Sequence, residues 1–401
     1  MVTVGMKRCI LKANSRLYRY LPFVLMSMTL LQQECMQSSR KEKPSNQPPV
    51  AGKEMVLSHA KGFSIEEMPG GKRVSVFNPW QGAENVVYRY WFTNDTTDDM
   101  EEMAREMRIH IPARRVICLS TTHVALVSFV NEENAIVGVS GASYLCNKIV
   151  RKKISEGKVP DVGYDLSLNY ELILSLHPDV VLAYGVNSQV TGVYERLKSL
   201  HIPTLFIGEY LEPDPLAKAE WVKLVACLFG KEDMAALKYA GIEAAYISTR
   251  DKVAKTTSRP MVMTGLPWKE TWNVAGGNSF TAKLIHDAGG VYLWSARETR
   301  DNIPLSVESV MNDSGQADIW INAGVAESLR DILATDDRLK DIRPFRLGQV
   351  YNNNAQMCPG GGNAYWESGV VNPDVVLREL VAIFHPELSE SVPFTYYMKL
   401  K

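Results

Sequence analysis

The chain has 401 residues and a formal net charge of -1, with 22% charged and 46% hydrophobic residues. This length predicts two domains, and the composition is that of an ordinary globular protein. A net charge near zero argues against a nucleic-acid partner, which needs a broad basic surface. No apolar run reaches the length that a transmembrane helix needs.

The first 35 residues differ from the rest of the chain. A basic stretch without acids precedes the apolar block "LPFVLMSMTLL", and Cys35 follows within four residues. This order is typical of a secretory signal peptide. It also resembles a bacterial lipoprotein signal, in which such a Cys is lipidated, although Gln33 and Glu34 stand where small residues are preferred. An ordinary signal peptide with an incidental Cys is the alternative. Residues 36–53 are polar and Pro-rich, which predicts a flexible tether.

Residues 54–230 are predicted to form an N-terminal lobe. Alternating runs on both sides of Pro69 predict a β-hairpin, residues 86–92 a strand, and residues 98–107 a short helix. Short apolar strands then alternate with helices, and the strands lie in "RVICLSTT", "AIVGVSG", "PDVVLAYG" and "IPTLFIG". This alternation predicts a parallel, doubly wound sheet.

A long helix is predicted to separate this lobe from a second one. Residues 214–230 have an amphipathic helical pattern, and residues 231–258 continue as the interlobe helix without a breaker before Pro260. The residues expected on its apolar side are Met234, Leu237, Gly241, Ala244 and Ile247. The alternation restarts in residues 259–395, with strands in "PMVMTG", "ADIWINAG" and "QVYNNN" and a closing helix in "NPDVVLRELVAIFHP".

One motif occurs in both predicted lobes. "NYELILSLHPDVVLAYG" and "SVESVMNDSGQADIWINAG" each begin with a good helix N-cap, carry Glu two positions later, and reach an Asp before an apolar run that ends in Gly. The matching residues are Asn169 with Ser306, Glu171 with Glu308, and Asp179 with Asp318. A fold class of α/β follows, with two Rossmann-like lobes joined by one long α-helix and an extra N-terminal β-hairpin region.

The order and spacing of these segments resemble those of the helix-linked (type III) periplasmic substrate-binding proteins of ABC importers for cobalamin, ferric siderophores or haem. The resemblance covers roughly residues 109–388, and the closing segment "GGGNAYWESGVVNPD" is similar to the Bacteroides-like lipoprotein version. It implies a periplasmic or envelope location, a small organic metal complex as ligand, and an ABC permease dimer with its ATPase as partner. It also implies that Glu171 and Glu308 dock against the permease. Without the resemblance, helix capping alone explains both residues.

Aromatic residues are the positive signal for ligand binding. Several follow predicted strands, at the edge where α/β sheets bind ligands, and their flat side chains suit macrocycles and catechols. The residues expected to contact ligand are Trp268, Trp272 and Tyr365, followed by Tyr144, Tyr184, Trp366 and His123. Trp294 and Trp320 are expected in the core, although core packing could also explain each of the others taken singly.

The remaining patterns point away from catalysis and bound metal. The seven His residues have no paired spacing, "PGGGNAYW" is not a phosphate-binding loop, and "GVSGAS" is not a nucleophile elbow. Neither a cofactor nor an enzymatic activity is therefore expected. Cys118 and Cys227 are expected to be buried, and any disulfide among these two, Cys146 and Cys358 stays open.

Together with the resemblance, the sequence thus predicts a monomeric binding protein that captures ligand for an ABC importer and is anchored through Cys35. A surface scavenger of vitamin or haem without a permease is one alternative. An enzyme on a doubly wound scaffold is the other.

Overall fold

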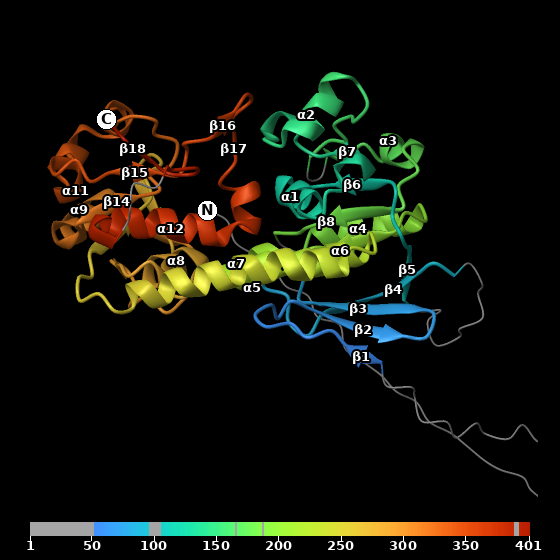
Figure 1. The fold of residues 1–401 in the computed structure, drawn as a ribbon. Coiled ribbons are helices and arrows are strands. Elements are labelled where there is room, and N and C mark those ends of the chain that lie inside the picture. Colours follow the sequence, from blue (N-terminus) through green and yellow to red (C-terminus); the bar gives the residue numbers. More distant parts are fainter. Residues whose placement is uncertain (1–51, 96–105, 165–166, 187, 389–392) are drawn as a thin grey trace, which may run out of the picture. The chain divides into compact units, whose positions relative to one another are not determined.

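The computed structural model describes residues 52–95, 106–164, 167–186, 188–388 and 393–401 (Figure 1). The signal segment with Cys35, nearly all of the tether and most of the helix predicted for residues 98–107 lie outside these ranges. The fold class is the predicted one: two α/β lobes with parallel sheets, and a long helix between them in sequence.

The N-terminal extension is a five-stranded sheet in the order β1-β2-β3-β4-β5. Its strands are β1 (Lys53–Glu54), β2 (Phe63–Met68), β3 (Gly71–Phe77), β4 (Val87–Thr93) and β5 (Met107–His110). The predicted hairpin is confirmed: β2 and β3 are antiparallel and turn at Gly70, whose φ of +84° is one that glycine adopts readily. The inward side chains of the sheet are part of the N-terminal lobe's core, so the extension folds with that lobe.

The N-terminal lobe contains a parallel sheet in the order β7-β6-β8-β9. Its strands are β6 (Val116–Cys118), β7 (Ile136–Val139), β8 (Val180–Ala183) and β9 (Thr204–Phe206), and its helices are α1 (Thr121–Phe129), α2 (Lys148–Ser155), α3 (Tyr170–Ser175) and α4 (Val190–Ser199). All residues of β6, β8 and β9 are buried, as expected for strands covered on both faces. The chain goes from β6 to β7 on one side and then crosses to β8 on the other.

The C-terminal lobe repeats this connectivity. Its parallel strands are ordered β12-β10-β14, with β10 (Met261–Thr264) again in the middle, β12 (Val291–Tyr292) second and β14 (Ile319–Ile321) third. Val350 extends the sheet beside Trp320 and leads into β15 (Tyr351–Asn352), which pairs with β18 (Met398–Lys399). The other elements are the ribbon β11 (Thr271–Val274) with β13 (Ile303–Ser306), and helices α8 (Phe280–Asp287), α9 (Val307–Asp313), α10 (Leu329–Thr335), α11 (Arg343–Arg346) and α12 (Pro373–Phe384).

The predicted interlobe helix is α7 (Glu232–Val253), preceded by α5 (Pro215–Glu220) and α6 (Val222–Cys227). Acidic residues in its first turn and basic residues in its last turn complement the helix dipole. Tyr239 is buried in the core of the N-terminal lobe, and Tyr246, two helical turns later, is buried in the core of the C-terminal lobe. The helix thus anchors both lobes. The apolar side predicted from Leu237 is wrong, because that side chain is 78% exposed.

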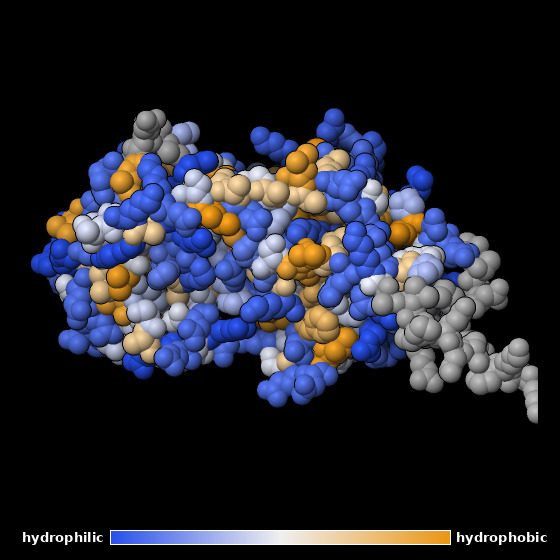
Figure 2. Space-filling model, turned by 60° about the horizontal axis from the view of Figure 1, so that its bottom comes forward, coloured by the Kyte–Doolittle hydropathy of each residue, from blue (hydrophilic) through white to orange (hydrophobic). Residues whose placement is uncertain are grey.

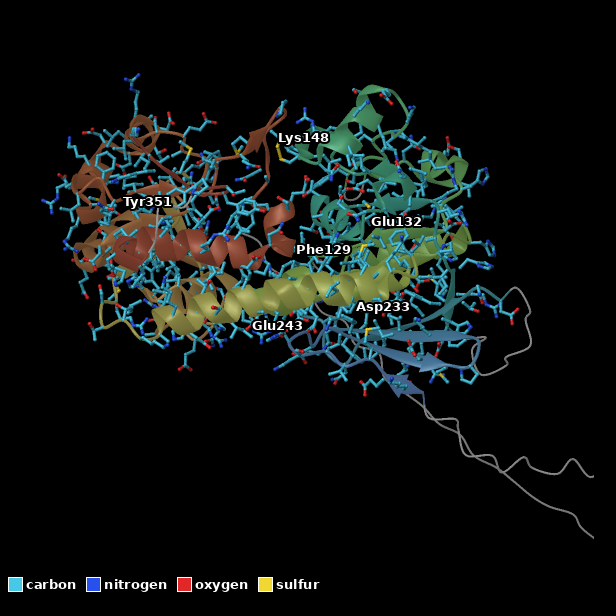
Figure 3. All side chains as sticks on the ribbon, in the orientation of Figure 1. Phe129, Glu132, Lys148, Asp233, Glu243 and Tyr351 are labelled. Atoms are coloured by element: carbon cyan, nitrogen blue, oxygen red, sulfur yellow. A yellow bond between two sulfur atoms is a disulfide. The ribbon has the colours of Figure 1, made fainter. Side chains whose placement is uncertain are left out.

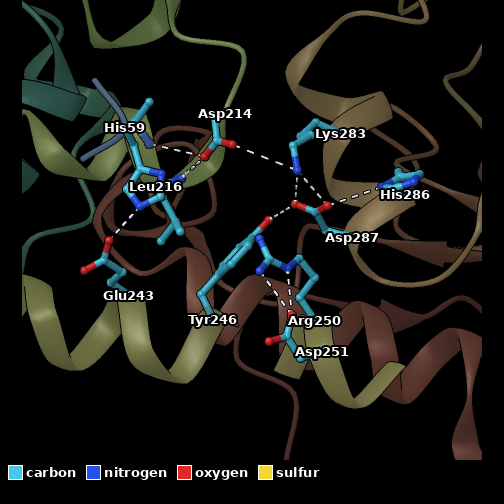
Figure 4. A network of polar contacts seen from close by, with 11 residues as sticks. His59, Asp214, Leu216, Glu243, Tyr246, Arg250, Asp251, Lys283, His286 and Asp287 are labelled. Atoms are coloured by element: carbon cyan, nitrogen blue, oxygen red, sulfur yellow. Dashed lines mark hydrogen bonds and ion pairs between the residues drawn. The ribbon is translucent and has the colours of Figure 1, made fainter. Parts of the chain in front are cut away.

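Polar contacts connect α7 to both of its neighbours (Figure 4). His59 of the extension contacts Glu243 at 2.6 Å. One helical turn further, the Tyr246 hydroxyl donates to the buried carboxylate of Asp287 at 2.8 Å, and Lys283 pairs with that same carboxylate from within α8. These contacts join the extension, α7 and α8 into one base under the two lobes.

Small apolar patches lie among hydrophilic side chains on the face of the molecule shown in Figure 2. Within the described ranges, no helix combines the length and the apolar character that crossing a membrane requires. Cys118 and Cys227 are free and buried, and Trp294 and Trp320 belong to the core, as the sequence predicts.

Candidate ligand-binding site

A cavity of about 410 Å³ opens at the carboxyl edge of the N-terminal sheet. It begins where β6, β7 and β8 end, at Leu119, Ser140 and Tyr184. This is the point at which the chain switches sides of the sheet, where open α/β sheets characteristically bind ligands. The volume lies within the usual range for small-molecule sites.

The lining is neutral among the residues that the structure describes. It combines two tyrosines, two serines and a glutamine with aliphatic side chains and one glycine, and the full set is Leu119, Ser140, Tyr164, Ser167, Leu168, Ala183, Tyr184, Gly185, Val186, Gln189, Val190 and Val193. Hydroxyl and amide groups can donate and accept hydrogen bonds without introducing charge. The cavity therefore suits the uncharged, partly apolar face of a ligand.

Of the residues predicted to contact ligand, Tyr184 lines this cavity, and His123 packs against Tyr184. His123 lies in α1 and is fully buried, with its ring edge-on to that of Tyr184 at a centroid distance of 6.0 Å. Burial disfavours the imidazolium and lowers the pKa of His123 to about 3. The ring is therefore neutral at physiological pH. The expectation that His123 is a ligand-facing residue is corrected, because its side chain is covered.

At the carboxyl edge of the C-terminal sheet, Trp268 follows β10 and is 75% exposed. Val325 follows β14 and is also almost fully exposed. The large aromatic surface of Trp268 is therefore available to a binding partner at this edge. A ligand-contacting residue must be exposed at this edge, and Trp268 is. Its contact with ligand stays a prediction.

Trp272 and Tyr365 are core residues, contrary to the sequence-based expectation. Trp272 has no exposed surface; its indole N–H donates to the Thr264 carbonyl at 3.0 Å, and its ring packs against Trp320. Tyr365 is 5% exposed and packs against Tyr397, and burial raises its pKa to about 12. Trp272 lies within β11, which pairs with β13, whereas Trp268 precedes this ribbon, and the local sequence does not reveal which of the two becomes covered.

Tyr144 and Trp366 are each 53% exposed, so both can meet a ligand. Tyr144 ends the 3₁₀ helix η3 (Ala142–Tyr144), directly after β7. Its ring and that of Tyr164 both approach Gly141, which has no side chain. Tyr164 lines the neutral cavity, and Tyr144 lies near it, beside Gly141.

Sequence reasoning missed most of the cavity. Ser140 lies at the end of one predicted strand segment, Val186 directly follows another and Gln189 comes three residues later, so the rule that selected the aromatics could have found them. Tyr164 and Ser167 come from a segment between α2 and α3 that has no periodic pattern. Only the folded chain brings that segment to the sheet edge.

The repeated motif has the same structure in both lobes. Asn169 and Ser306 cap α3 and α9 by accepting from backbone N–H groups three residues on, as predicted. Glu171 and Glu308 lie in the first turns and are exposed, and Arg338 binds Glu308 at 2.8 Å and lowers its pKa. α3 precedes β8 and α9 precedes β14, so the two carboxylates occupy equivalent places.

No cluster of three His, Cys, Asp or Glu side chains that could hold a metal ion occurs within the described ranges. The chemistry available at the sheet edges is hydrogen bonding by neutral groups and contact with aromatic rings. Both are means of holding an organic molecule.

Residues 116–356 match the sequence profile of a family described as periplasmic binding protein. The chain belongs to the periplasmic binding protein family. The match begins at the first strand of the N-terminal sheet and therefore excludes the β1–β5 extension.

Relatives of this periplasmic binding protein come from bacteria and archaea. An uncharacterized lipoprotein of Methanocaldococcus jannaschii is 24% identical over 376 residues, covering 88% of this chain and 87% of its own. A periplasmic heme binding protein from Pseudomonas aeruginosa has a TM-score of 0.56 at 18% identity, covering 72% of this chain and 98% of its own. The periplasmic vitamin B12 binding protein of Vibrio cholerae has a TM-score of 0.51 at 14% identity, covering 70% and 99%.

The family match shows a solute-binding role, and the solved structures show the fold. The relative from Methanocaldococcus jannaschii aligns with more of this periplasmic binding protein than the family profile does, so the similarity reaches beyond the two-lobe core.

Proposed function

We propose that the protein is the substrate-binding component of an ABC importer that captures an organic metal complex and delivers it to a membrane permease. The observation that carries this proposal is the cavity at the carboxyl edge of the N-terminal sheet, with Tyr144 and Tyr164 beside it. Exposed Trp268 lies at the corresponding edge of the other lobe. Solved structures with the same fold are described as binding heme or vitamin B12.

The lining favours one kind of complex. A charged group that is taken out of water needs a charged or hydrogen-bonded partner. The described lining offers hydroxyl and amide groups and no cation. A corrinoid, whose apolar ring carries uncharged amides, or a neutral ferric hydroxamate therefore suits the cavity better than a trianionic ferric catecholate. Haem should suit the cavity less well than a neutral complex and better than the catecholate, because its charged propionates can remain outside the cavity.

Visible-light titration tests the proposal directly. Cyanocobalamin, haemin, a ferric trihydroxamate and a ferric triscatecholate have different absorption bands, so binding of each is followed by its own spectrum. We expect saturable 1:1 binding of an uncharged complex. The proposal fails if all four probes leave the spectrum unchanged, and the charge argument fails if the catecholate alone binds.

Gln189→Glu makes the charge argument sharper. The change keeps the size of the side chain and places a carboxylate in the neutral lining. Affinity for an uncharged complex should fall at least tenfold, since the new charge loses solvation when the ligand covers it. Gln316→Glu, at an exposed position far from the lining residues, is the matched control and should bind normally.

Delivery to a permease, anchoring through Cys35 and a location in the periplasm or envelope complete the proposal. Equivalent placement of Glu171 and Glu308 supports a partner with two-fold symmetry, since such a partner presents the same basic site twice. A monomeric binding protein of this kind would dock through both lobes at once.

A further inference from the structure

A small hairpin of the C-terminal lobe reaches the N-terminal lobe. Its strands are β16 (Met357–Cys358) and β17 (Gly362–Asn363), and they follow β15 of the C-terminal sheet. The hairpin packs against η3, the 3₁₀ helix that follows β7 of the N-terminal sheet. The family match ends at residue 356, immediately before it.

A disulfide fastens the hairpin to the N-terminal lobe. Cys146, two residues after Tyr144, is bonded to Cys358 of β16 across 212 residues of sequence. The bond is drawn in yellow close to Lys148 in Figure 3, between the two lobes. Both cysteines come from segments that leave the carboxyl edges of their sheets, so the bond holds these two edges toward each other.

Three further contacts hold the hairpin against the N-terminal lobe. The buried carboxylate of Glu367 accepts a hydrogen bond from the Cys146 N–H at 2.7 Å. Gly360 and Gly362 lie so close to the carbonyls of Ser143 and Tyr144 that a side chain on either glycine would collide with them. The hairpin is therefore in tight backbone contact with the segment that carries Tyr144.

The two lobes are held together by non-covalent packing, which includes η8 (Ser368–Val371) against α1, and by one covalent bond among the described residues. Helix α7 anchors a tyrosine in each core at the base, and the disulfide joins the edges where the proposed ligand-contacting residues lie. Without the disulfide, only non-covalent contacts would oppose a rotation of one lobe about the base. The covalent bond limits that rotation to what the short hairpin allows.

We propose that the Cys146–Cys358 disulfide is a positioning element of the ligand site, which holds Tyr144 at the cavity margin and limits the separation of the two lobes. The ligand role of this element rests on the proposed function, but the limit on lobe separation does not. In the oxidised protein the ligand leaves through a restricted opening, so release is slow. An exported location keeps such a bond oxidised.

The separation of the lobes can be measured without ligand. Fluorophores are attached through azide-bearing amino acids at Ser175 of α3 and Asn312 of α9, both exposed, so that no new thiol is introduced. Single-molecule energy transfer in the full-length protein should show one narrow distance distribution. After reduction, or in the Cys146→Ser/Cys358→Ser variant, a second population with longer distances should appear. Reoxidation of the reduced wild type should remove it.

Release kinetics test the role at the site. With whichever of haemin, cyanocobalamin and the ferric trihydroxamate binds, the dissociation rate should rise at least fivefold in the double variant, with association changed less than twofold. Reductant should act on the wild type and leave the variant unchanged. Identical distance distributions in oxidised and reduced protein would overturn the proposal. Unfolding on reduction would overturn it as well, because the bond would then stabilise the fold instead of limiting motion. A failure of all probes to bind would count against the proposed function alone.

Discussion

Asp179 and Asp318 make the same contact in the two lobes. The Asp179 carboxylate accepts from the backbone N–H groups of Arg114 and Arg115 at 2.7 and 2.9 Å, just before β6. The Asp318 carboxylate accepts from the N–H of Met261 at 2.8 Å, at the start of β10. Each Asp thus ties the third strand of its sheet to the first. This contact explains why the repeated motif keeps an Asp immediately before its apolar strand.

Replacing either Asp by Ala should destabilise its lobe. Hydrogen bonds to a charged acceptor contribute about 1.5–3 kcal/mol, so the free energy of unfolding should fall by about 2 kcal/mol in each variant. Urea denaturation followed by circular dichroism measures the change. Asp251→Ala, whose carboxylate is 60% exposed and pairs with its neighbour Arg250, is the control and should unfold as the wild type does. Equal stability of all three variants would contradict the structural role.

Trp268 and Trp272 should respond in opposite ways to replacement by Ala. Trp268→Ala should weaken ligand binding by about 2 kcal/mol or more and leave stability unchanged, because the side chain is exposed. Trp272→Ala should lower the free energy of unfolding by about 3–5 kcal/mol, since it removes a buried aromatic from the core. Binding titrations and urea denaturation on both variants separate the two effects. Normal binding by Trp268→Ala would remove that residue from the site.

His123 should make the protein sensitive to mild acid. Its pKa is about 3 in the folded protein and near 6.5 in an unfolded chain, so protons bind preferentially to the unfolded form between these values. The contribution to stability is complete above pH 6.5 and is lost as the pH falls toward 3. At pH 5 the loss amounts to about 2 kcal/mol. Urea midpoints at pH 8 and pH 5 should therefore differ by less in His123→Leu than in the wild type.

The decisive outcome is a smaller change in urea midpoint between pH 8 and pH 5 in His123→Leu than in the wild type. The absolute stability is not decisive, because His123→Leu also changes packing and can alter stability equally at both pH values. If the wild type and His123→Leu lose the same free energy between pH 8 and pH 5, other groups cause the acid sensitivity.

Glu171→Gln and Glu308→Gln should impair delivery without affecting capture. Gln keeps the shape of the side chain and its capping environment but removes the charge that would meet a basic permease surface. Ligand affinity should be unchanged, while stimulation of the permease ATPase falls, most strongly in the double variant. Glu156→Gln, another exposed carboxylate in an ion pair, is the matched control. Normal stimulation by the double variant would show that both carboxylates only complement the helix dipole.

Cys35→Ala should release the protein from membranes. A lipidated Cys carries acyl chains, and two or three of them anchor a protein stably. Membrane fractionation with intact-mass measurement should find wild-type protein in the membrane fraction with an added lipid mass. Identical fractionation of wild type and Cys35→Ala would rule out the lipoprotein assignment.

The order of strands and helices was readable from the sequence because periodicity is a local property. Parallel strands covered on both faces are continuous apolar runs, as in "VVLA" of β8. The first residue of a helix is often marked by a capping side chain, as at Asn169 and Ser306. The internal repeat, the interlobe helix and the sheet edge at which the cavity lies all follow from such local signals. The hairpin in the extension was equally local, since its turn needs glycine at positive φ.

Which side chains are exposed was decided only by the tertiary structure. Trp268 and Trp272 are four residues apart and alike in sequence context, yet one is 75% exposed and the other has no exposed surface, because β13 and Trp320 cover only the second. Cys146 and Cys358 are separated by 212 residues, and nothing near either of them indicates its partner. Burial and long-range pairing depend on how distant segments pack together, and a local pattern carries no information about the segment that arrives from elsewhere in the chain.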